Sequence, residues 1–275
     1  MNQTSAILIG VSGPCLRNYR SREQEQAGST FSEAIGEACI KILVALTGSS
    51  SGLGSAMASL LLERQQHRLL LVARRFDARQ TEAARQNPEE VHLVQSDLRN
   101  PELTTIESTL RKCMNGVSRV VFVCNAAVVT PIGPARDLPV DELSASITVN
   151  FTSCMQLTIA ILKAAGSAKA SVRVLNITSG AALRPVAGWS VYCSTKAGLR
   201  MFFDVISTET AGSHEAFTVA HIDPGVINTK MQAAIRAASK EGFPRHQEFV
   251  EMHLTGKLRS PEVAAHEILS REGLL

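Results

Sequence analysis

Tyr192 and Lys196 stand four positions apart in the stretch YCSTK, a spacing that places both side chains on one face of a helix. A phenol that titrates near about pH 10 needs a neighbouring positive charge before it can exchange a proton at neutral pH. A lysine ammonium one turn away can supply that charge. The pair is therefore a candidate proton donor beside the cation that tunes it. The alternative is an ordinary surface helix, because a helical YxxxK also occurs by chance.

A glycine-rich stretch, TGSSSGLG at residues 47–54, lies between the apolar run ILVAL and a segment with apolar residues at helical spacing. Glycine lets the backbone turn sharply and approach a pyrophosphate, whose charge is favoured by the free N–H groups of a helix N-terminus. The stretch predicts a dinucleotide-binding turn made by Gly48, Ser50, Ser51, Gly52, Leu53 and Gly54. Glycines that only tighten a strand-to-helix turn are the alternative. The stretch lacks a GK[ST] ending, which argues against a phosphoryl-transfer loop.

Two arginines, Arg74 and Arg75, end the second apolar run, VARR. A dinucleotide fold that prefers NAD usually carries an acidic residue there for the ribose 2′-hydroxyl. A guanidinium instead matches a 2′-phosphate in charge and geometry. The pair predicts NADP(H) as cofactor, and two solvated arginines at a strand end are the alternative reading.

Six short apolar runs alternate with stretches long enough for crossover helices, including 139–165 and 190–212. The runs are ILVAL, RLLLVA, VHLVQS, RVVFVCN, VRVLNIT and FTVAHID. This alternation predicts an α/β fold, a doubly wound parallel sheet of Rossmann type, as a single domain over residues 41–275. Ligands of such sheets bind beyond the carboxyl ends of the strands, where the glycine-rich turn and the arginines fall.

Composition narrows the class of protein. The chain has 275 residues, 45% of them hydrophobic and 19% charged, with a net charge of +3 that is not gathered into a basic run. These values predict a globular protein without a nucleic-acid partner, and no apolar run suggests a membrane span. The cysteines and histidines show no metal-ligand spacing, and the cysteine spacing is not that of a secreted disulfide framework. A cytoplasmic location is expected.

Residues 1–40 differ from the rest of the chain. They are serine-rich and carry Arg17, Arg20 and Arg22 before the first acidic residue, Glu23. The pattern weakly matches a mitochondrial presequence, but its apolar run is broken by Gly and Pro. We expect a poorly ordered extension or an imprecise start of the gene sequence.

Several further motifs carry a family resemblance. They are SDL at 96–98, CNAA at 124–127, NITS at 176–179 and DPGVINT at 223–229. Together with TGSSSGLG and YCSTK, in this order, they resemble the short-chain dehydrogenase/reductase family. Within that family, GWSVYCSTKAGLRMFF followed by DPGVINTKMQ most resembles the branch of sepiapterin and benzil reductases.

The resemblance implies roles for four residues around a substrate carbonyl. Tyr192 would donate a proton to its oxygen, and Lys196 would tune the phenol and bond the nicotinamide ribose. Ser179 would polarise the carbonyl, with Thr178 as the competing hydroxyl. Asn150, in TVNF, would hold a proton-relay water behind the lysine.

The resemblance also implies the rest of the cofactor site. Asp97 and Leu98 would flank the adenine, with Asn125 and Ala126 beside its ribose, although Asp97 could instead cap a helix. The loop with Pro224, Gly225, Ile227 and Thr229 would hold the nicotinamide carboxamide, although Pro-Gly is also a common turn. Family members commonly form homodimers or homotetramers through the helices that carry Asn150 and Tyr192.

Two departures from the family pattern stand out. Ala127 replaces a usual glycine, and the chain ends at LSREGLL, where the family adds one more strand. In sepiapterin reductases an acidic residue of that last segment anchors the pterin.

The expected function is an NADPH-dependent reductase of a small ketone or dicarbonyl. The alternative is an NADP(H)-binding regulatory protein with little turnover. Residues 231–256 are expected to form a helical flap over the substrate, or else a solvated helix pair.

Overall fold

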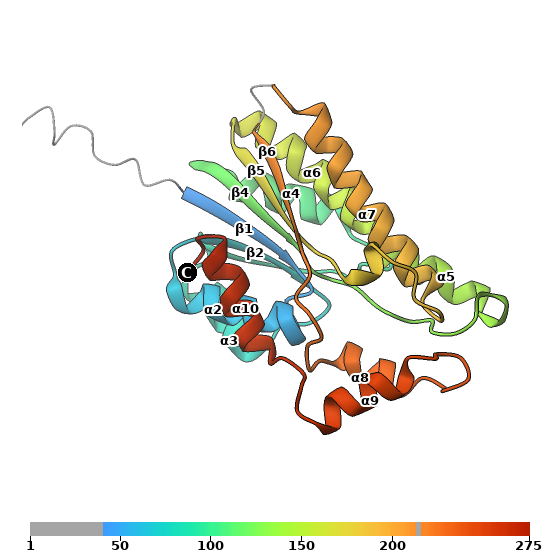
Figure 1. Ribbon diagram of the computed structural model, residues 1–275. Helices are drawn as coiled ribbons and strands as arrows, with labels where there is room; N and C mark the ends of the chain where they lie inside the picture. The colour runs from blue at the N-terminus through green and yellow to red at the C-terminus, as the bar shows by residue number, and fades with distance from the viewer. Residues whose placement is uncertain (1–40, 213–215) are drawn as a thin grey trace, which may run out of the picture. The chain divides into compact units, whose positions relative to one another are not determined.

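The computed structural model describes residues 41–212 and 216–275, so the extension predicted for residues 1–40 lies outside the described residues. The described chain folds around a parallel sheet of six strands in the order β3-β2-β1-β4-β5-β6 (Figure 1). The strands are β1 (Lys41–Thr47), β2 (Arg68–Ala73), β3 (Val91–Gln95), β4 (Val117–Cys124), β5 (Ser171–Ile177) and β6 (Phe217–Ile222). The order reverses between β1 and β4, which creates the switch point where ligands bind in such folds.

Helices cover both faces of the sheet. They are α2 (Gly52–Arg64), α3 (Ala78–Gln86), α4 (Leu103–Cys113), α5 (Val140–Ile147), α6 (Ser153–Ala168), α7 (Ser190–Glu209), α8 (Lys230–Arg236), α9 (His246–Leu254) and α10 (Pro261–Arg271). Side chains of α2 and α10 pack on one face and those of α4, α6 and α7 on the other (Figure 1). The predicted α/β fold with a doubly wound parallel sheet is confirmed.

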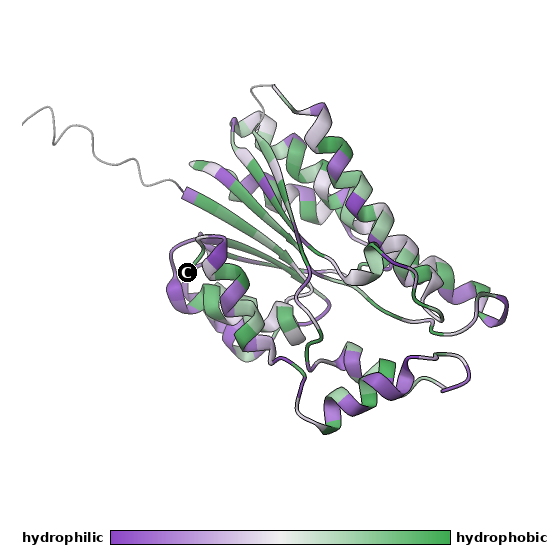
Figure 2. Ribbon diagram, in the orientation of Figure 1, coloured by the Kyte–Doolittle hydropathy of each residue, from purple (hydrophilic) through white to green (hydrophobic). Residues whose placement is uncertain are grey.

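The strands are almost wholly apolar because both faces of the sheet are covered. All six residues of β2 are buried, and Figure 2 shows hydrophobic strands between helices whose outer surfaces are polar. Each of the six apolar runs forms one strand, with ends that differ from the run by no more than two residues. The predicted crossover segments form α5 with α6, and α7.

One helical segment requires a correction. Val140–Ala168, which joins α5, a π-helical turn (Thr148–Thr152) and α6, is long and apolar enough to span a membrane by length and composition. Sequence analysis found no such run. Cys154, Leu157 and Ile161 of this segment are buried in the core beside β4 and α4, which makes it a core helix of the domain.

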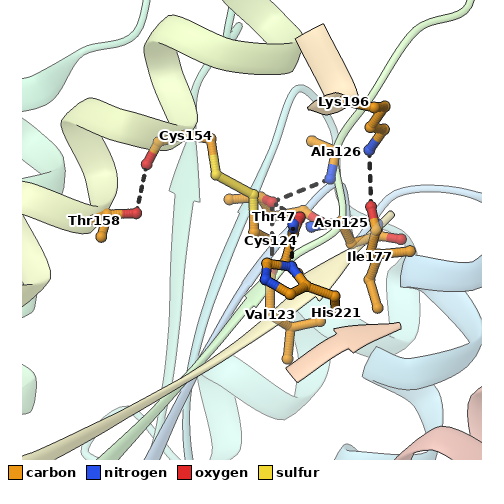
Figure 3. Close-up of a disulfide and its surroundings, with 11 residues drawn as sticks. Thr47, Val123, Cys124, Asn125, Ala126, Cys154, Thr158, Ile177, Lys196 and His221 are labelled. Atoms are coloured by element: carbon orange, nitrogen blue, oxygen red, sulfur yellow. Dashed lines mark hydrogen bonds between the residues drawn. A yellow bond between two sulfur atoms is a disulfide. The ribbon is translucent and has the colours of Figure 1, made fainter. Parts of the chain in front are cut away.

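A disulfide joins Cys124, the last residue of β4, to Cys154 on α6 (Figure 3). The cysteine spacing in the sequence gave no indication of this pairing, because the two residues are 30 positions apart and meet only in the folded chain. Among the described cysteines, Cys113 and Cys193 are free.

The last helix packs against the first helix of the described residues. Helix α10 lies against α2, and Leu274 beyond it is 1% exposed in the same core cluster. In the described part of the chain, β6 is the edge strand beside β5. Glu272, just after α10, forms an ion pair with Arg173 of β5 at 2.6 Å.

Candidate active site

A cavity of about 710 Å³ opens at the carboxyl ends of the strands. Its size is in the range of small-molecule and cofactor sites. Most of the predicted site residues line it: Gly48, Ser50, Ser51, Gly52, Leu53, Arg74, Asp97, Leu98, Asn125, Ala126, Ser179, Tyr192, Lys196, Pro224, Gly225, Ile227 and Thr229. Gly54, Arg75 and Asn150 do not line it.

The glycine-rich turn is packed too closely for side chains. Gly48 and Gly52 have φ angles of +74° and +55°, which favour glycine. A Cβ on Gly54 would lie 2.2 Å from the Gly48 carbonyl oxygen, and one on Gly52 would lie 3.0 Å from Thr229. Gly54 therefore shapes the turn from behind, and Gly52 brings the turn against the 223–229 loop. The result is a backbone cradle at the start of α2 that fits a pyrophosphate.

Hydrogen bonds from neighbouring elements hold this cradle in place. The Thr47 hydroxyl accepts from the backbone N–H groups of Asn125 and Ala126, each at 3.1 Å (Figure 3). The Asn125 side-chain amide donates to the Thr47 carbonyl at 2.9 Å. On α3, the buried Gln80 amide donates to the Ser49 carbonyl at 2.9 Å. The turn is thus tied both to the end of β4 and to α3.

One end of the cavity, lined by Arg74, Asp97 and Arg99, has a free cation among the described residues. The Asp97 carboxylate is bound by Arg99 through its backbone N–H at 3.0 Å and its guanidinium, which lower the pKa of that carboxyl. Arg74 is exposed, lies within electrostatic reach of Asp97, and has no hydrogen bond or ion pair with the described residues. Because Arg99 already pairs with the Asp97 carboxylate, the positive charge of Arg74 is not cancelled. A 2′-phosphate would require such a cation. Sequence analysis missed Arg99, which also lines the cavity.

Tyr192 is buried at the centre of the cavity wall. Only 7% of its surface is exposed, and its hydroxyl shares a hydrogen bond with the Ser179 hydroxyl. The competing hydroxyl of Thr178 is buried and has no partner in the described chain. Ser179, and not Thr178, therefore stands beside the phenol. Ser179 also accepts from the Ala181 N–H at 3.2 Å, which fixes its position.

The pKa of Tyr192 differs from the expectation that Lys196 lowers it. Burial raises the pKa of Tyr192 to about 12, while the Ser179 hydrogen bond opposes that rise. The Lys196 ammonium donates to the Ile177 carbonyl at 2.8 Å (Figure 3). It lies 5.9 Å from the centre of the Tyr192 ring. Burial lowers the pKa of Lys196 to about 8. A phenol with a raised pKa keeps its proton at neutral pH, which is the state that a proton donor requires.

Asn150 lies in the π-helical turn, behind the cavity wall. Its amide donates to the Val128 carbonyl and accepts from the Val128 N–H, both at 2.7 Å, and it reaches Thr195 of α7 at 3.4 Å. Among the described residues its side chain bonds Val128 and Thr195 and not Lys196, so Asn150 ties the segment after β4 to α7. π-helical turns are frequent at functional sites.

An aromatic wall closes the other end of the cavity. Trp189 stacks on Phe243 at 5.0 Å, meets Phe249 of α9 at 5.6 Å, and packs edge-on against Tyr192 at 5.5 Å. The Gln232 amide of α8 donates to the Phe249 carbonyl at 3.1 Å and so joins α8 to α9. The predicted helical flap is thus a helix pair that lines the cavity. Sequence analysis missed this wall because its members lie up to 60 positions apart.

Comparison with known proteins agrees with this geometry. The family model for short chain dehydrogenases matches residues 42–240, which is more than half of the chain. The chain belongs to the short-chain dehydrogenase family. The family uses NAD(P)(H) for oxidation and reduction, and the glycine cradle and the cavity fit such a nucleotide.

Individual relatives lie near the branch indicated by the motifs. The chain is 32% identical over 230 residues to a benzil reductase ((S)-benzoin forming) of Bacillus cereus, covering 82% of this chain and 91% of that one. It is 31% identical over 248 residues to the sepiapterin reductase of Bos taurus, covering 84% and 89%. The solved structure of the KRED1-Pglu enzyme superposes with a TM-score of 0.69 at 29% identity, covering 84% and 93%. The predicted family and its branch are confirmed.

Proposed function

We propose that this short-chain dehydrogenase is an NADPH-dependent carbonyl reductase that acts on aryl ketones and dicarbonyls. One observation carries the proposal: the hydrogen-bonded Tyr192 and Ser179 lie in the same cavity as the wall of Trp189 and Phe249. Aromatic rings stack favourably on such a wall. Benzil, the substrate named for the Bacillus relative, is a diaryl dicarbonyl.

The residues would divide the reduction between them. Bound NADPH supplies the hydride that the carbonyl carbon receives. The Ser179 hydroxyl holds the carbonyl oxygen, and Tyr192 transfers its phenolic proton to that oxygen, so that the product is a neutral alcohol. Lys196, fixed by the Ile177 carbonyl, keeps positive charge near the phenolate that forms. Asn150 would help to position Tyr192 and Lys196, because it bonds Val128 and also Thr195 on the same helix, α7.

The cofactor would lie along the cavity with its phosphates on the glycine turn. Asp97, Leu98, Asn125 and Ala126 would surround the adenosine, and the loop of Pro224, Gly225, Ile227 and Thr229 would hold the carboxamide. Each of these residues lines the cavity, which supports the assignment. Gly54 shapes the turn without lining the cavity. Arg75, the second arginine predicted at the 2′-phosphate, does not line the cavity either, so this contact is proposed for Arg74 alone.

NADPH oxidation with a panel of substrates tests this function. The absorbance of NADPH should fall with benzil or another aryl diketone, and the panel should include sepiapterin. The alternative is a regulatory protein that binds NADP(H) without turnover. It would show saturable NADPH binding by fluorescence with no oxidation of NADPH by any compound of the panel.

Arg74→Ala should reduce the preference for NADPH over NADH. Loss of a charge-assisted phosphate contact costs about 1.5–3 kcal/mol, which is about a ten- to hundredfold rise in the Kd of NADPH. The Kd of NADH should stay within about twofold, because NADH has no 2′-phosphate. Calorimetric titration of both nucleotides measures the two constants. Arg75→Ala is the matched control, since Arg75 does not line the cavity and should have the smaller effect; equal weakening of both nucleotides by Arg74→Ala would contradict the assignment.

We also propose that the protein forms a homodimer or homotetramer. Four apolar side chains are exposed on α5, α6 and α7, namely Ile147 (40%), Ile159 (44%), Met201 (63%) and Val205 (46%). Exposed apolar patches commonly mark protein interfaces. The double variant Met201→Glu, Val205→Glu should elute as a monomer with unchanged circular dichroism, and Leu254→Glu, on α9, should keep the parent mass. Light scattering coupled to size exclusion measures these masses, and a monomeric parent would refute the proposal.

A cytoplasmic location remains a proposal, drawn from the cysteine spacing of the sequence. The Cys124–Cys154 disulfide is of a kind that is uncommon in that compartment. Small carbonyl compounds are the proposed partners of the site, with no nucleic acid, membrane or metal involved. Over residues 41–212 and 216–275, no group of three or more His, Cys, Asp and Glu side chains is placed to hold a metal ion.

A further inference from the structure

One basic side chain at the substrate end of the cavity lacks a protein partner. Arg184 lines the same cavity as Tyr192 and Ser179. Its guanidinium makes no hydrogen bond and no ion pair with the residues that the structure describes. The neighbouring arginine of the cavity, Arg245, is instead held by Glu248 at 2.5 and 2.7 Å. Among the described residues that line the cavity beside Ser179, Arg184 is therefore an exposed cation whose hydrogen-bond donors are free for a ligand.

The guanidinium of Arg184 lies next to the proposed reacting groups. Its Nη2 and Nε atoms are 3.4 and 3.7 Å from the point where a Cβ of Gly180 would be. Gly180 directly follows Ser179, whose hydroxyl is bonded to Tyr192. Asp223 Oδ2 lies 3.6 Å from the same point. Arg184 and Asp223 thus flank the backbone of Gly180, one residue away from the hydroxyl that would hold the substrate oxygen.

The surrounding charge favours a neutral acceptor over an anion. Asp223 is close enough to raise the pKa of Tyr192, and Arg184 is close enough to lower the pKa of Glu248. Glu248 is already held by Arg245, so Asp223 is the carboxylate that faces Arg184 across Gly180. A substrate carboxylate placed here would meet the repulsion of Asp223. A carbonyl oxygen would accept a hydrogen bond from the guanidinium without that repulsion.

We infer that Arg184 selects vicinal dicarbonyl substrates by donating to the second carbonyl oxygen while Ser179 and Tyr192 hold the reacting one. This inference rests on the proposed function and assigns its substrate preference to one residue. The second oxygen of a vicinal dicarbonyl is bonded to the carbon next to the reacting one. The Arg184 guanidinium lies beside Gly180, the residue after Ser179, and so on the side where that second oxygen would be. A monoketone of the same size leaves the guanidinium without that bond. A 2-oxo acid brings a negative charge to Asp223.

The test compares three compounds in the parent and in Arg184→Met. Benzil and deoxybenzoin have the same two rings and differ in the second oxygen, and benzoylformate replaces one aryl ketone by a carboxylate. In each protein kcat/KM is measured with NADPH for all three. The ratio of benzil to deoxybenzoin should fall about tenfold or more in Arg184→Met, because one charge-assisted hydrogen bond is lost. Dividing the ratio in the variant by that in the parent cancels the intrinsic reactivity of the compounds.

Two further variants make the result specific. Arg184→Lys keeps the charge and one donor and should recover part of the ratio. Arg245→Met removes a second arginine that lines the cavity and should keep the ratio of the parent, because Glu248 already binds that guanidinium. An unchanged ratio in Arg184→Met, or a parent that prefers benzoylformate to benzil, would overturn the inference. A parent that reduces none of the three would instead refute the proposed function, so the two failures are distinguishable.

Discussion

Tyr192→Phe is expected to reduce carbonyl turnover by about a hundredfold or more, while NADPH binding and the fold are retained. The substitution removes one hydroxyl from a side chain that is otherwise held by Trp189 and by the core. The hydroxyl bonds only the Ser179 hydroxyl, so its loss leaves Ser179 bound to the Ala181 N–H. Turnover at saturating NADPH, the Kd of NADPH by fluorescence, and the thermal melting temperature measure the three quantities.

The matched control for this prediction is Thr178→Val. Thr178 is the neighbouring hydroxyl that lacks a partner, so its loss should change turnover far less than the loss of the Tyr192 hydroxyl. A Tyr192→Phe protein that turns over within about twofold of the parent would reject Tyr192 as the proton donor. Loss of NADPH binding together with turnover would indicate a structural role instead.

Lys196→Met should weaken cofactor binding and lower turnover together. The ammonium is the buried cation beside Tyr192, and its position is fixed from the end of β5 by the Ile177 carbonyl. If it bonds the nicotinamide ribose, its loss removes a charge-assisted hydrogen bond worth about 1.5–3 kcal/mol. Turnover falls further because no cation remains near the phenolate. A change in kcat with an unaltered Kd of NADPH would rule out the contact to the ribose.

The same variant has a signature in stability that does not depend on catalysis. Burial lowers the pKa of Lys196 from 10.5 to about 8, so between these values the unfolded chain binds more protons than the cofactor-free fold. The free energy of unfolding therefore gains about 2 kcal/mol from this residue between about pH 8 and pH 10, and the gain is absent below that range. Burial raises the pKa of Tyr192 and of Cys113, so above their ordinary pKa values these two groups lower the free energy of unfolding as the pH rises.

Urea unfolding of the cofactor-free parent and of Lys196→Met over this pH range isolates the contribution of the lysine. The difference in unfolding free energy between the two proteins should grow with pH in favour of the parent, because all other groups are common to both. A constant difference would show that Lys196 is not buried as a titrating ammonium.

The sequence by itself determined the sheet and the glycine turn that lines the cavity. Apolar runs such as RLLLVA can only be strands covered on both faces, and their alternation with helical segments leaves one sheet class. Glycines in the turn after β1 have a local reason, because their φ angles and close contacts exclude side chains. Tyr192 and Lys196 are neighbours by helical spacing alone. Such features depend on residues close in the chain, where geometry is fixed by the backbone.

The tertiary structure alone decided which groups meet across the sheet. Arg99 neutralises Asp97 and leaves Arg74 free, although the sequence offers several arginines for either role. The pKa of Tyr192 rises because the phenol is buried, an effect that spacing from Lys196 does not reveal. The aromatic wall joins Trp189 to Phe243 and Phe249 from separate segments.

The disulfide and the meeting of Arg184 with Asp223 have the same physical origin. Cys124 and Cys154 come together only because α6 packs beside the end of β4, and Arg184 and Asp223 flank Gly180 only because β5 and β6 are neighbouring strands. Burial, desolvation and contacts between distant segments depend on how the whole chain packs. The shape of the glycine turn follows from local sequence, whereas the surroundings of Tyr192 and Ser179 follow from packing.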